Sequence, residues 1–175
     1  MGIEIRIAVP EDAFAACDVL RRSITECCVA DHRHDPEALT AWLGNKTPQN
    51  VASWFVSPAN HALVAERDGA VVGVALLTQA GKLSLCYVLP EALYSGVGKA
   101  LLHGVEAQAR AWGVSVLRLN STITASKFYE RNGYILAGKE KSCYGLECDF
   151  FWKKLNACET IDPSPRKRFC NCTGQ

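Results

Sequence analysis

The sequence predicts a single domain of the α/β class, because strand-like and helix-like segments alternate along most of its 175 residues. Two segments carry this prediction. The unbroken apolar segment at residues 83–88 is typical of a buried strand, and the segment at residues 97–112 has the apolar spacing of an amphipathic helix. A third observation is Asp68-Gly69, which lies between two apolar segments and predicts a β-hairpin.

The first third of the chain is expected to be mainly helical. A strand at residues 4–9 ends at Pro10, and apolar residues at near-helical spacing then predict a helix over residues 11–27. The polar segment at residues 31–35, which holds two Asp and two His residues, is expected to be a loop. Pro36 begins a second helix that runs through Leu43, and a short helix is expected at residues 48–56.

The remainder of the chain supplies most of the strands. Residues 62–67 and 71–78 form the hairpin, and the strand at residues 83–88 is expected to be buried on both faces. The helix at residues 97–112 ends at Gly113; a strand at residues 114–119 and a short helix at residues 125–131 follow. Residues 134–140 and 147–155 form a closing antiparallel pair. We assign residues 1–155 to this domain and expect residues 156–175 to form a flexible polar tail.

The composition is that of an ordinary globular protein, with 49% hydrophobic and 21% charged residues. A formal net charge of +1 argues against nucleic acid or an anionic membrane as a partner. No apolar segment approaches the length of a transmembrane helix, and Glu4 and Arg6 interrupt any signal-peptide core. We therefore expect a cytoplasmic protein.

Nine cysteines are many for a chain of this length, and we expect them to be free thiols rather than metal ligands. Cys27 and Cys28 are adjacent and cannot easily serve one tetrahedral site. The spacing of Cys158, Cys170 and Cys172 is not that of a zinc finger or ribbon, so no metal is expected. A metal or disulfide role for these three tail residues stays open.

A glycine-bearing loop follows the strand at residues 83–88 and leads into the helix at residues 97–112. Gly96 and Gly98 let the backbone approach a ligand closely, and the start of the helix offers unpaired N–H groups and a positive dipole end. These features predict a phosphate or pyrophosphate site. The expected contacts are the backbone N–H groups of Tyr94, Ser95, Gly96, Val97, Gly98 and Lys99.

Two nucleotide-binding motifs are disfavoured at this loop. A Walker-type loop requires glycine five residues before the Gly98-Lys99 pair and Ser or Thr after it, but these positions hold Leu93 and Ala100. A dinucleotide fingerprint requires a third glycine where Leu101 stands. A magnesium-dependent nucleotide binder is therefore the least favoured function for this loop.

Two motifs in order resemble those of the GNAT superfamily of acyl-CoA-dependent N-acyltransferases. The first is Tyr87-Val88-Leu89-Pro90 followed by Gly96 and Gly98, and the second is the Ala-x-x-Phe-Tyr-Glu-x-x-Gly-Tyr pattern at residues 125–134. The resemblance extends from Glu4 to about Leu155. It departs from the family at Leu93, where relatives carry Arg or Gln, so that one side-chain contact to the pyrophosphate is lost.

The resemblance implies a GNAT fold, with a mixed, mostly antiparallel sheet of about six or seven strands and about four or five flanking helices. The central strands at residues 83–88 and 114–119 are expected to splay apart. The pantetheine arm of the cofactor would bind there as an added strand, against Cys86, Tyr87 and Val88. Relatives often place Asn where Thr122 stands, and Asn120 is expected to replace that contact.

The implied activity is the transfer of an acetyl group from acetyl-CoA to a primary amine by direct attack on the thioester. Tyr129 matches the family tyrosine that protonates the departing thiolate, and a backbone N–H near Val88 would polarise the thioester oxygen. A buried tyrosine that only bonds a backbone carbonyl is the alternative reading of Tyr129. The acceptor would be a small-molecule or peptide amine, and a homodimer is possible. The alternative function is a non-catalytic acyl-CoA-binding or regulatory module.

The sequence shows no general base at the positions that relatives use. Those positions hold Lys82, Ser84 and Leu117, none of which is a carboxylate or imidazole. Ordered water, a group from the segment at residues 31–35, or Glu66 stay open as proton acceptors. Asp35 is equally well placed to cap the helix that begins at Pro36.

Overall fold

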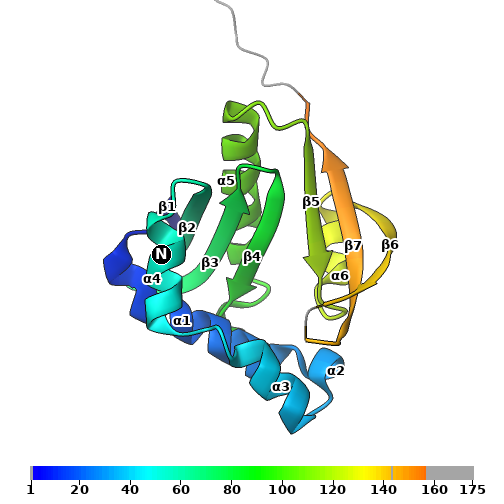
Figure 1. Cartoon of the computed structure of the whole chain (residues 1–175). Helices are drawn as coiled ribbons and strands as arrows, with labels where there is room; N and C mark the ends of the chain where they lie inside the picture. The colour runs from blue at the N-terminus through cyan, green and yellow to red at the C-terminus, as the bar shows by residue number, and fades with distance from the viewer. Residues whose placement is uncertain (1, 143, 157–175) are drawn as a thin grey trace, which may run out of the picture.

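The computed structural model describes residues 2–142 and 144–156, which form a seven-stranded sheet with helices on both faces (Figure 1). The strand order is β1-β2-β3-β4-β5-β7-β6. The strands are β1 (Glu4–Ile7), β2 (Asn60–Arg67), β3 (Ala70–Thr78), β4 (Lys82–Val88), β5 (Val116–Ser121), β6 (Ile135–Lys141) and β7 (Glu147–Lys154). The helices are α1 (Ala13–Arg22), α2 (Val29–His32), α3 (Pro36–Leu43), α4 (Pro48–Val56), α5 (Val97–Ala111) and α6 (Ser126–Arg131). The 3-10 turns η1 (Pro10–Asp12) and η3 (Pro90–Ala92) and the π-helical turn η2 (Ser23–Cys27) complete the helical segments.

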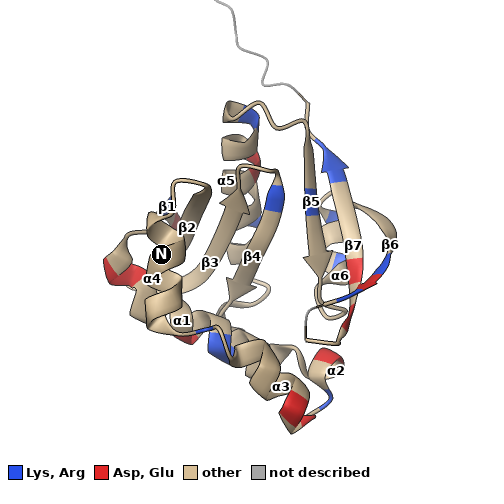
Figure 2. Cartoon of the chain, in the orientation of Figure 1, with Lys and Arg blue, Asp and Glu red and all other residues tan. Residues whose placement is uncertain are grey.

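Every neighbouring strand pair is antiparallel except β4 and β5, which confirms the expected mixed sheet. Helices α1 and α4 cover one face, and α5 and α6 cover the other (Figure 1). Acidic and basic residues are interspersed over both the helices and the strands (Figure 2). None of the described helices has the length and hydrophobicity of a membrane-spanning segment.

Local signals set the ends of the early elements as predicted. The Asp35 side chain accepts a hydrogen bond from the Glu37 N–H at 3.0 Å and caps α3. Thr47 caps α4 in the same way, through the Asn50 N–H at 3.2 Å. The hairpin between β2 and β3 turns at Asp68 and Gly69, whose φ values of 53° and 78° fit a two-residue turn with positive φ at both positions.

The predicted helix over residues 11–27 is not one regular helix. It begins as a 3-10 turn, continues as α1 and ends in the single π-helical turn η2. The Nε2 of His32 lies 3.1 Å from the Ile24 carbonyl oxygen and 3.2 Å from that of Thr25, and Nδ1 accepts a hydrogen bond from the His34 N–H. These contacts imply that Nε2 carries the hydrogen, so His32 donates to carbonyl groups of the π-helical turn η2.

The expectation that residues 31–35 form a polar loop is wrong for the first two of them. Asp31 and His32 belong to the short helix α2, and their exposed fractions are 9% and 2%. Asp31 is buried because its carboxylate bonds to a loop almost a hundred residues away, which no local pattern reveals.

Strand β4 pairs with β5 only through its first two residues, Lys82 with Arg118 and Leu83 with Leu119. Beyond Leu83 they diverge, as Figure 1 shows, which confirms the expected splayed pair. The expectation that residues 83–88 are buried on both faces is wrong, because Ser84 is exposed and Cys86 and Tyr87 are only half-buried. Ser84 lies just beyond the last β4 residue that pairs with β5, where the sheet opens.

The core lies on both sides of the central strands. Helix α5 packs closely on β3, where a Cβ added to Gly73 would lie 2.9 Å from both Val97 and Leu101. Leu101 of α5, Leu117 of β5 and Phe151 of β7 are fully buried. Residues 157–175, for which we expected a flexible tail, lie outside the described part of the chain, together with three of its cysteines and Cys143.

Candidate active site

A cavity of about 760 Å³ opens between the diverging strands β4 and β5; we call it the larger cavity. The start of α5, helix α6 and the turn η2 complete its wall. All predicted site residues border this cavity except two; those that do are Cys86, Tyr87, Val88, Tyr94, Gly96, Gly98, Lys99, Asn120 and Tyr129. The exceptions are Val97, whose side chain is fully buried, and Ser95, whose hydroxyl donates to the Ala92 carbonyl at 2.5 Å.

The glycine loop presents a row of free N–H groups to this cavity. Gly96, at φ 90°, is the N-cap of α5, and its carbonyl accepts the first hydrogen bond of the helix from the Ala100 N–H at 3.0 Å. Within the described residues, no acceptor bonds the N–H groups of residues 94–99. They lie at the positive end of the 15-residue helix α5, so the loop can hold an anionic phosphate group.

Gly98 is required by close packing as well as by the loop. A Cβ at this position would lie 3.3 Å from the Phe128 ring and 3.9 Å from Val88. Glycine therefore lets the start of α5 approach both α6 and the end of β4.

The backbone of β4 alternates between β3 and the larger cavity. The Leu89 N–H donates to the Val72 carbonyl at 2.9 Å, and the register places Tyr87 opposite Val74. Since hydrogen-bonded pairs alternate along an antiparallel ladder, Tyr87 bonds β3, and Cys86 and Val88 direct their N–H and C=O groups at the opening. An extended ligand with amide groups could pair with these two residues.

Tyr129 lies at the inner end of the larger cavity and is 6% exposed. Its ring is held by three aromatic neighbours, with centroids 5.1 Å away at Phe128, 5.6 Å at Tyr134 and 5.9 Å at Phe151. Burial raises the pKa of Tyr129 well above its usual value, and the nearby Cys86 thiol adds to the shift. The hydroxyl therefore stays protonated and can act as a hydrogen-bond donor. Burial also raises the pKa of Cys86, to about 11.

Two carboxylates, Asp31 and Asp149, hold the loop before α6, a role that sequence reasoning did not predict for either. Asp31 accepts hydrogen bonds from the Ile123 N–H and the Thr124 hydroxyl, both at 2.6 Å, and from the Thr124 N–H at 3.4 Å. Asp149 of β7 accepts a short hydrogen bond from the Ser126 hydroxyl, and its other oxygen lies 3.5 Å from the Lys139 Nζ. The two residues fix the start of the helix that carries Tyr129. Their spacing in the sequence gave no signal of this role.

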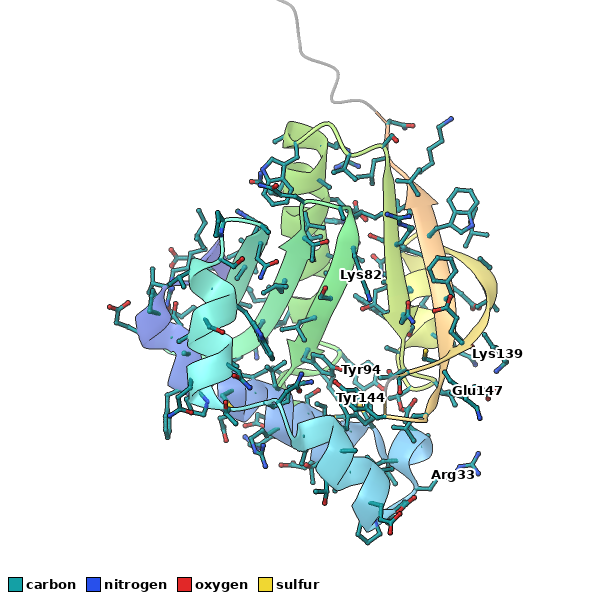
Figure 3. The ribbon with its side chains drawn as sticks, in the orientation of Figure 1. Arg33, Lys82, Tyr94, Lys139, Tyr144 and Glu147 are labelled. Atoms are coloured by element: carbon teal, nitrogen blue, oxygen red, sulfur yellow. The ribbon has the colours of Figure 1, made fainter. Side chains whose placement is uncertain are left out.

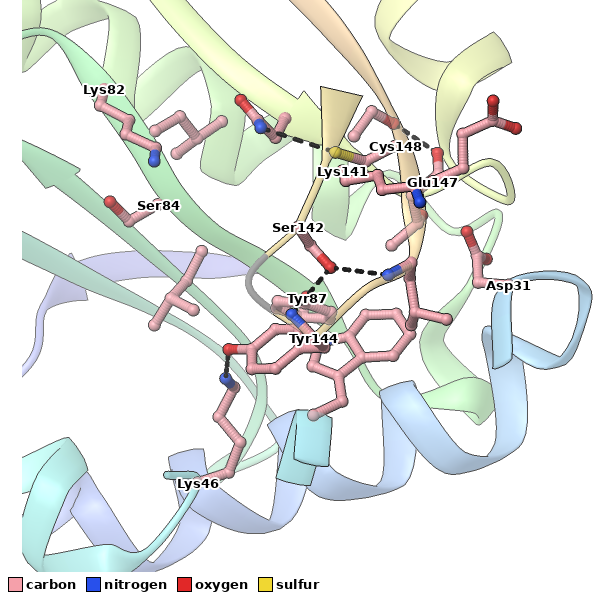
Figure 4. Close-up of a pocket in the computed structure, with 17 residues that line it drawn as sticks. Asp31, Lys46, Lys82, Ser84, Tyr87, Lys141, Ser142, Tyr144, Glu147 and Cys148 are labelled. Atoms are coloured by element: carbon pink, nitrogen blue, oxygen red, sulfur yellow. Dashed lines mark hydrogen bonds between the residues drawn. The ribbon is translucent and has the colours of Figure 1, made fainter. Parts of the chain in front are cut away.

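A second cavity of about 400 Å³, which we call the smaller cavity, lies among α3, β4, β5 and the hairpin between β6 and β7 (Figure 4). One wall is aromatic, with the rings of Trp42 and Tyr144 stacked at 6.3 Å. Residues common to both walls are Leu83, Ser84, Tyr87, Asn120, Ser121 and Thr122. The two cavities therefore meet at the point where β4 and β5 separate.

The candidate bases from the sequence are engaged elsewhere or, like the exposed His34, border neither cavity. Asp31 accepts three hydrogen bonds, both nitrogens of His32 have partners, and Asp35 caps α3. Glu66 pairs with Arg6 at 2.9 Å, on β2, and borders neither cavity. Of the positions that relatives use, Ser84 borders both cavities and Leu117 is fully buried.

Comparisons with known proteins agree with this geometry. The family model described as Acetyltransferase (GNAT) domain matches residues 30–148. An uncharacterized N-acetyltransferase of Mycobacterium tuberculosis is 30% identical over 111 residues, which cover 59% of this chain and 71% of the relative. An amino-acid acetyltransferase of Pseudomonas putida is 37% identical over 83 residues, covering 45% of this chain and 19% of that protein.

A solved structure supports the fold independently. The PaiA N-acetyltransferase of Thermoplasma acidophilum, in complex with coenzyme A, superposes with a TM-score of 0.78 at 22% identity. The alignment covers 88% of this chain and 99% of that one.

Proposed function

Because this chain belongs to the GNAT family of acetyltransferases, we propose that it moves an acetyl group from acetyl-CoA to a primary amine. The observation that carries the proposal is the convergence of three features on the larger cavity. These are the free N–H groups of residues 94–99, the unpaired backbone edge at Cys86 and Val88, and the buried hydroxyl of Tyr129. Together they match the phosphate, amide and thioester parts of one molecule.

Acetyl-CoA would bind with its pyrophosphate on the glycine loop and its pantetheine arm along β4. The N–H groups of the loop and the dipole of α5 would stabilise the phosphate charge. The backbone of Cys86 and Val88 would bond the pantetheine amides as a neighbouring strand would. Lys99 and Asn120 border the same cavity and would add polar contacts.

The acetyl group would lie close to Tyr129, near the junction of the two cavities. The amine nitrogen attacks the thioester carbon, a C–N bond forms, and the negative charge moves to the carbonyl oxygen. A backbone N–H in the opening stabilises this oxygen. We expected that donor near Val88, and the closeness of Tyr129 to Cys86 favours the N–H of Cys86 as a second donor.

Collapse of this intermediate breaks the C–S bond and leaves the CoA thiolate. The Tyr129 hydroxyl donates its proton to the sulfur, and the proton that the amine loses returns to the tyrosine through solvent. No free carboxylate or imidazole lies at the junction within the described residues, so ordered water is the proposed first proton acceptor. The acceptor amine would approach from the smaller cavity.

Steady-state release of CoA from acetyl-CoA with a panel of amines tests the proposal. Tyr129→Phe keeps the aromatic packing and should lower kcat by about 10²–10⁴-fold, the usual contribution of a positioned proton donor. CoA affinity, measured by calorimetry, should stay near that of the wild type. Tyr134→Phe is the matched control, because it also deletes a buried hydroxyl, one that donates to Glu106 at 3.0 Å outside both cavities.

The alternative is a CoA-binding module without turnover, and the engaged carboxylates around the junction are the observation in its favour. It predicts tight CoA binding with no thiol release for any amine. It also predicts that Tyr129→Phe and Tyr134→Phe behave alike.

A further inference from the structure

The smaller cavity has a charge pattern that bears on the acceptor. The charged residues of its wall are Lys46, Lys82, Lys141, Asp31 and Glu147. Both carboxylates are engaged: Asp31 by the loop before α6, and Glu147 by the Lys139 Nζ at 3.6 Å. The wall holds three lysines against two carboxylates, which gives it a net charge of +1, and neither carboxylate is free to bind an amine.

Lys82 is the lysine best placed to meet a ligand. It is exposed, and within residues 2–142 and 144–156 its Nζ has no hydrogen-bond or ion-pair partner. It stands at the start of β4, two residues before Ser84, and extends toward the opening between β4 and β5 (Figure 3). Two residues along a strand span about 7 Å, so an anion held by Lys82 lies close to the junction of the cavities.

Lys46 faces the same space from the opposite end (Figure 4). It is 4% exposed, and its Nζ is oriented by the Asn45 side chain at 2.7 Å and the Tyr144 hydroxyl at 3.2 Å. This position adds positive potential at the inner end of the cavity, next to the stacked rings of Trp42 and Tyr144.

We infer that the acceptor is an α-amino acid with an apolar side chain, and that Lys82 binds its carboxylate. This inference rests on the proposed function, since it names the amine that enters the smaller cavity. When its carboxylate binds Lys82, the amino acid has its amine next to Ser84, where the two cavities meet. The apolar side chain lies against the aromatic wall, where its burial is favourable.

The same charge pattern selects against other acceptors. A polyamine or a lysine-rich peptide would bring a second positive charge toward Lys82, and like charges at short range are unfavourable. An amino acid amide would leave the Lys82 ammonium without its charged partner.

Kinetics with matched acceptors test the inference. We would measure CoA release with leucine, phenylalanine, their carboxamides and 2-phenylethylamine. Lys82→Gln should lower kcat/KM for the two acids by about ten- to hundredfold, the value of a hydrogen bond to a charged group, and leave the amides unchanged. Lys82→Arg should retain most of the activity with acids. Comparing the acid-to-amide ratio between variants cancels the different basicities of their amines.

Lys154→Gln is the charge-matched control, because Lys154 is an exposed residue of β7 that borders neither cavity. It should leave the acid-to-amide ratio unchanged. The inference is overturned if Lys82→Gln lowers kcat/KM equally for acids and amides, or if the wild-type enzyme prefers amides or 2-phenylethylamine. In either case the proposed function stands.

A binding measurement separates the inference from turnover. Trp42 lies in the wall of the smaller cavity, so leucine binding to the CoA-loaded protein should change tryptophan fluorescence. Saturable binding of leucine that weakens at least tenfold in Lys82→Gln supports the inference even if no amine is acetylated, a result that would overturn only the proposed function. Equal binding by wild type and Lys82→Gln overturns the inference.

Discussion

The carboxylate of Asp31 accepts a hydrogen bond from the Ile123 N–H at 2.6 Å, and the two residues are 92 positions apart in the chain. This contact ties the short helix α2 to the loop that begins α6. It connects the N-terminal helices to the element that carries Tyr129, so changes at Asp31 should alter both stability and catalysis.

Asp31→Ala should lower the free energy of unfolding by at least about 2 kcal/mol, because it leaves buried donors of Ile123 and Thr124 without a charged acceptor. It should also lower kcat, since the start of α6 is no longer fixed. Urea denaturation and CoA-release kinetics measure the two effects. Asp35→Ala is the control and removes only a helix cap, which costs about 1 kcal/mol. Equal losses for the two variants would contradict the prediction.

Gly96→Ala should weaken CoA binding, and a second glycine separates this effect from backbone strain. Gly96 and Gly69 have φ values of 90° and 78°, and neither has a heavy atom closer than 3.9 Å to an added Cβ. Each alanine should therefore destabilise the fold by a similar amount, about 1–2 kcal/mol. Only the change at Gly96 should lower CoA affinity in calorimetry, because Gly69 lies in the hairpin between β2 and β3. Unchanged affinity in Gly96→Ala would remove the glycine loop from the site.

Leu93→Arg should restore a contact that relatives of this family make to the pyrophosphate. Leu93 borders the larger cavity and is 39% exposed, so a guanidinium there can reach a bound anion. An exposed ion pair of this kind should tighten CoA binding by about two- to fivefold at low salt, with the gain lost at high salt. Leu136→Arg, on β6, adds the same charge away from both cavities and should leave affinity unchanged. A gain in both variants would point to net charge alone.

Alkaline pH should destabilise the protein through the thiols of Cys86 and Cys28. Burial raises the pKa of Cys86 from 9.0 to about 11 and that of Cys28 from 9.0 to about 12. The unfolded chain therefore releases these protons at lower pH than the folded one, so stability is complete below about pH 9 and falls as the pH rises toward 11 or 12. The difference in unfolding free energy between wild type and Cys86→Ala should be constant from pH 6.5 to 8. Between pH 9 and 11 the wild type should lose stability relative to Cys86→Ala. Parallel curves over the whole range would show that Cys86 does not contribute.

The parts of the fold that the sequence predicted well depend on neighbouring residues. The bounds of α3 and α4 were predicted correctly because Pro36 and Pro48 fix the backbone and Asp35 and Thr47 cap the first turn. The hairpin was predicted from Asp68-Gly69, whose positive φ values need no distant contact.

The parts that the sequence could not predict depend on residues far apart in the chain. Asp31 and His32 looked solvent-exposed because the groups that they bond, the loop before α6 and the carbonyls of a π-helical turn, leave no periodic signal. The smaller cavity was missed for the same reason. Its wall joins Lys46, Lys82 and Tyr144, which come from three separate segments.

The separation of β4 from β5 gives the sheet an exposed edge in its own interior. Proteins usually cover such edges, because unpaired backbone groups invite association with other chains. If acetyl-CoA supplies the missing neighbour, the ligand completes the sheet as well as the reaction, and a hundredfold excess over its Kd would add about 2.7 kcal/mol to the stability of the fold. The amount of folded enzyme in a cell would then follow the supply of its own substrate.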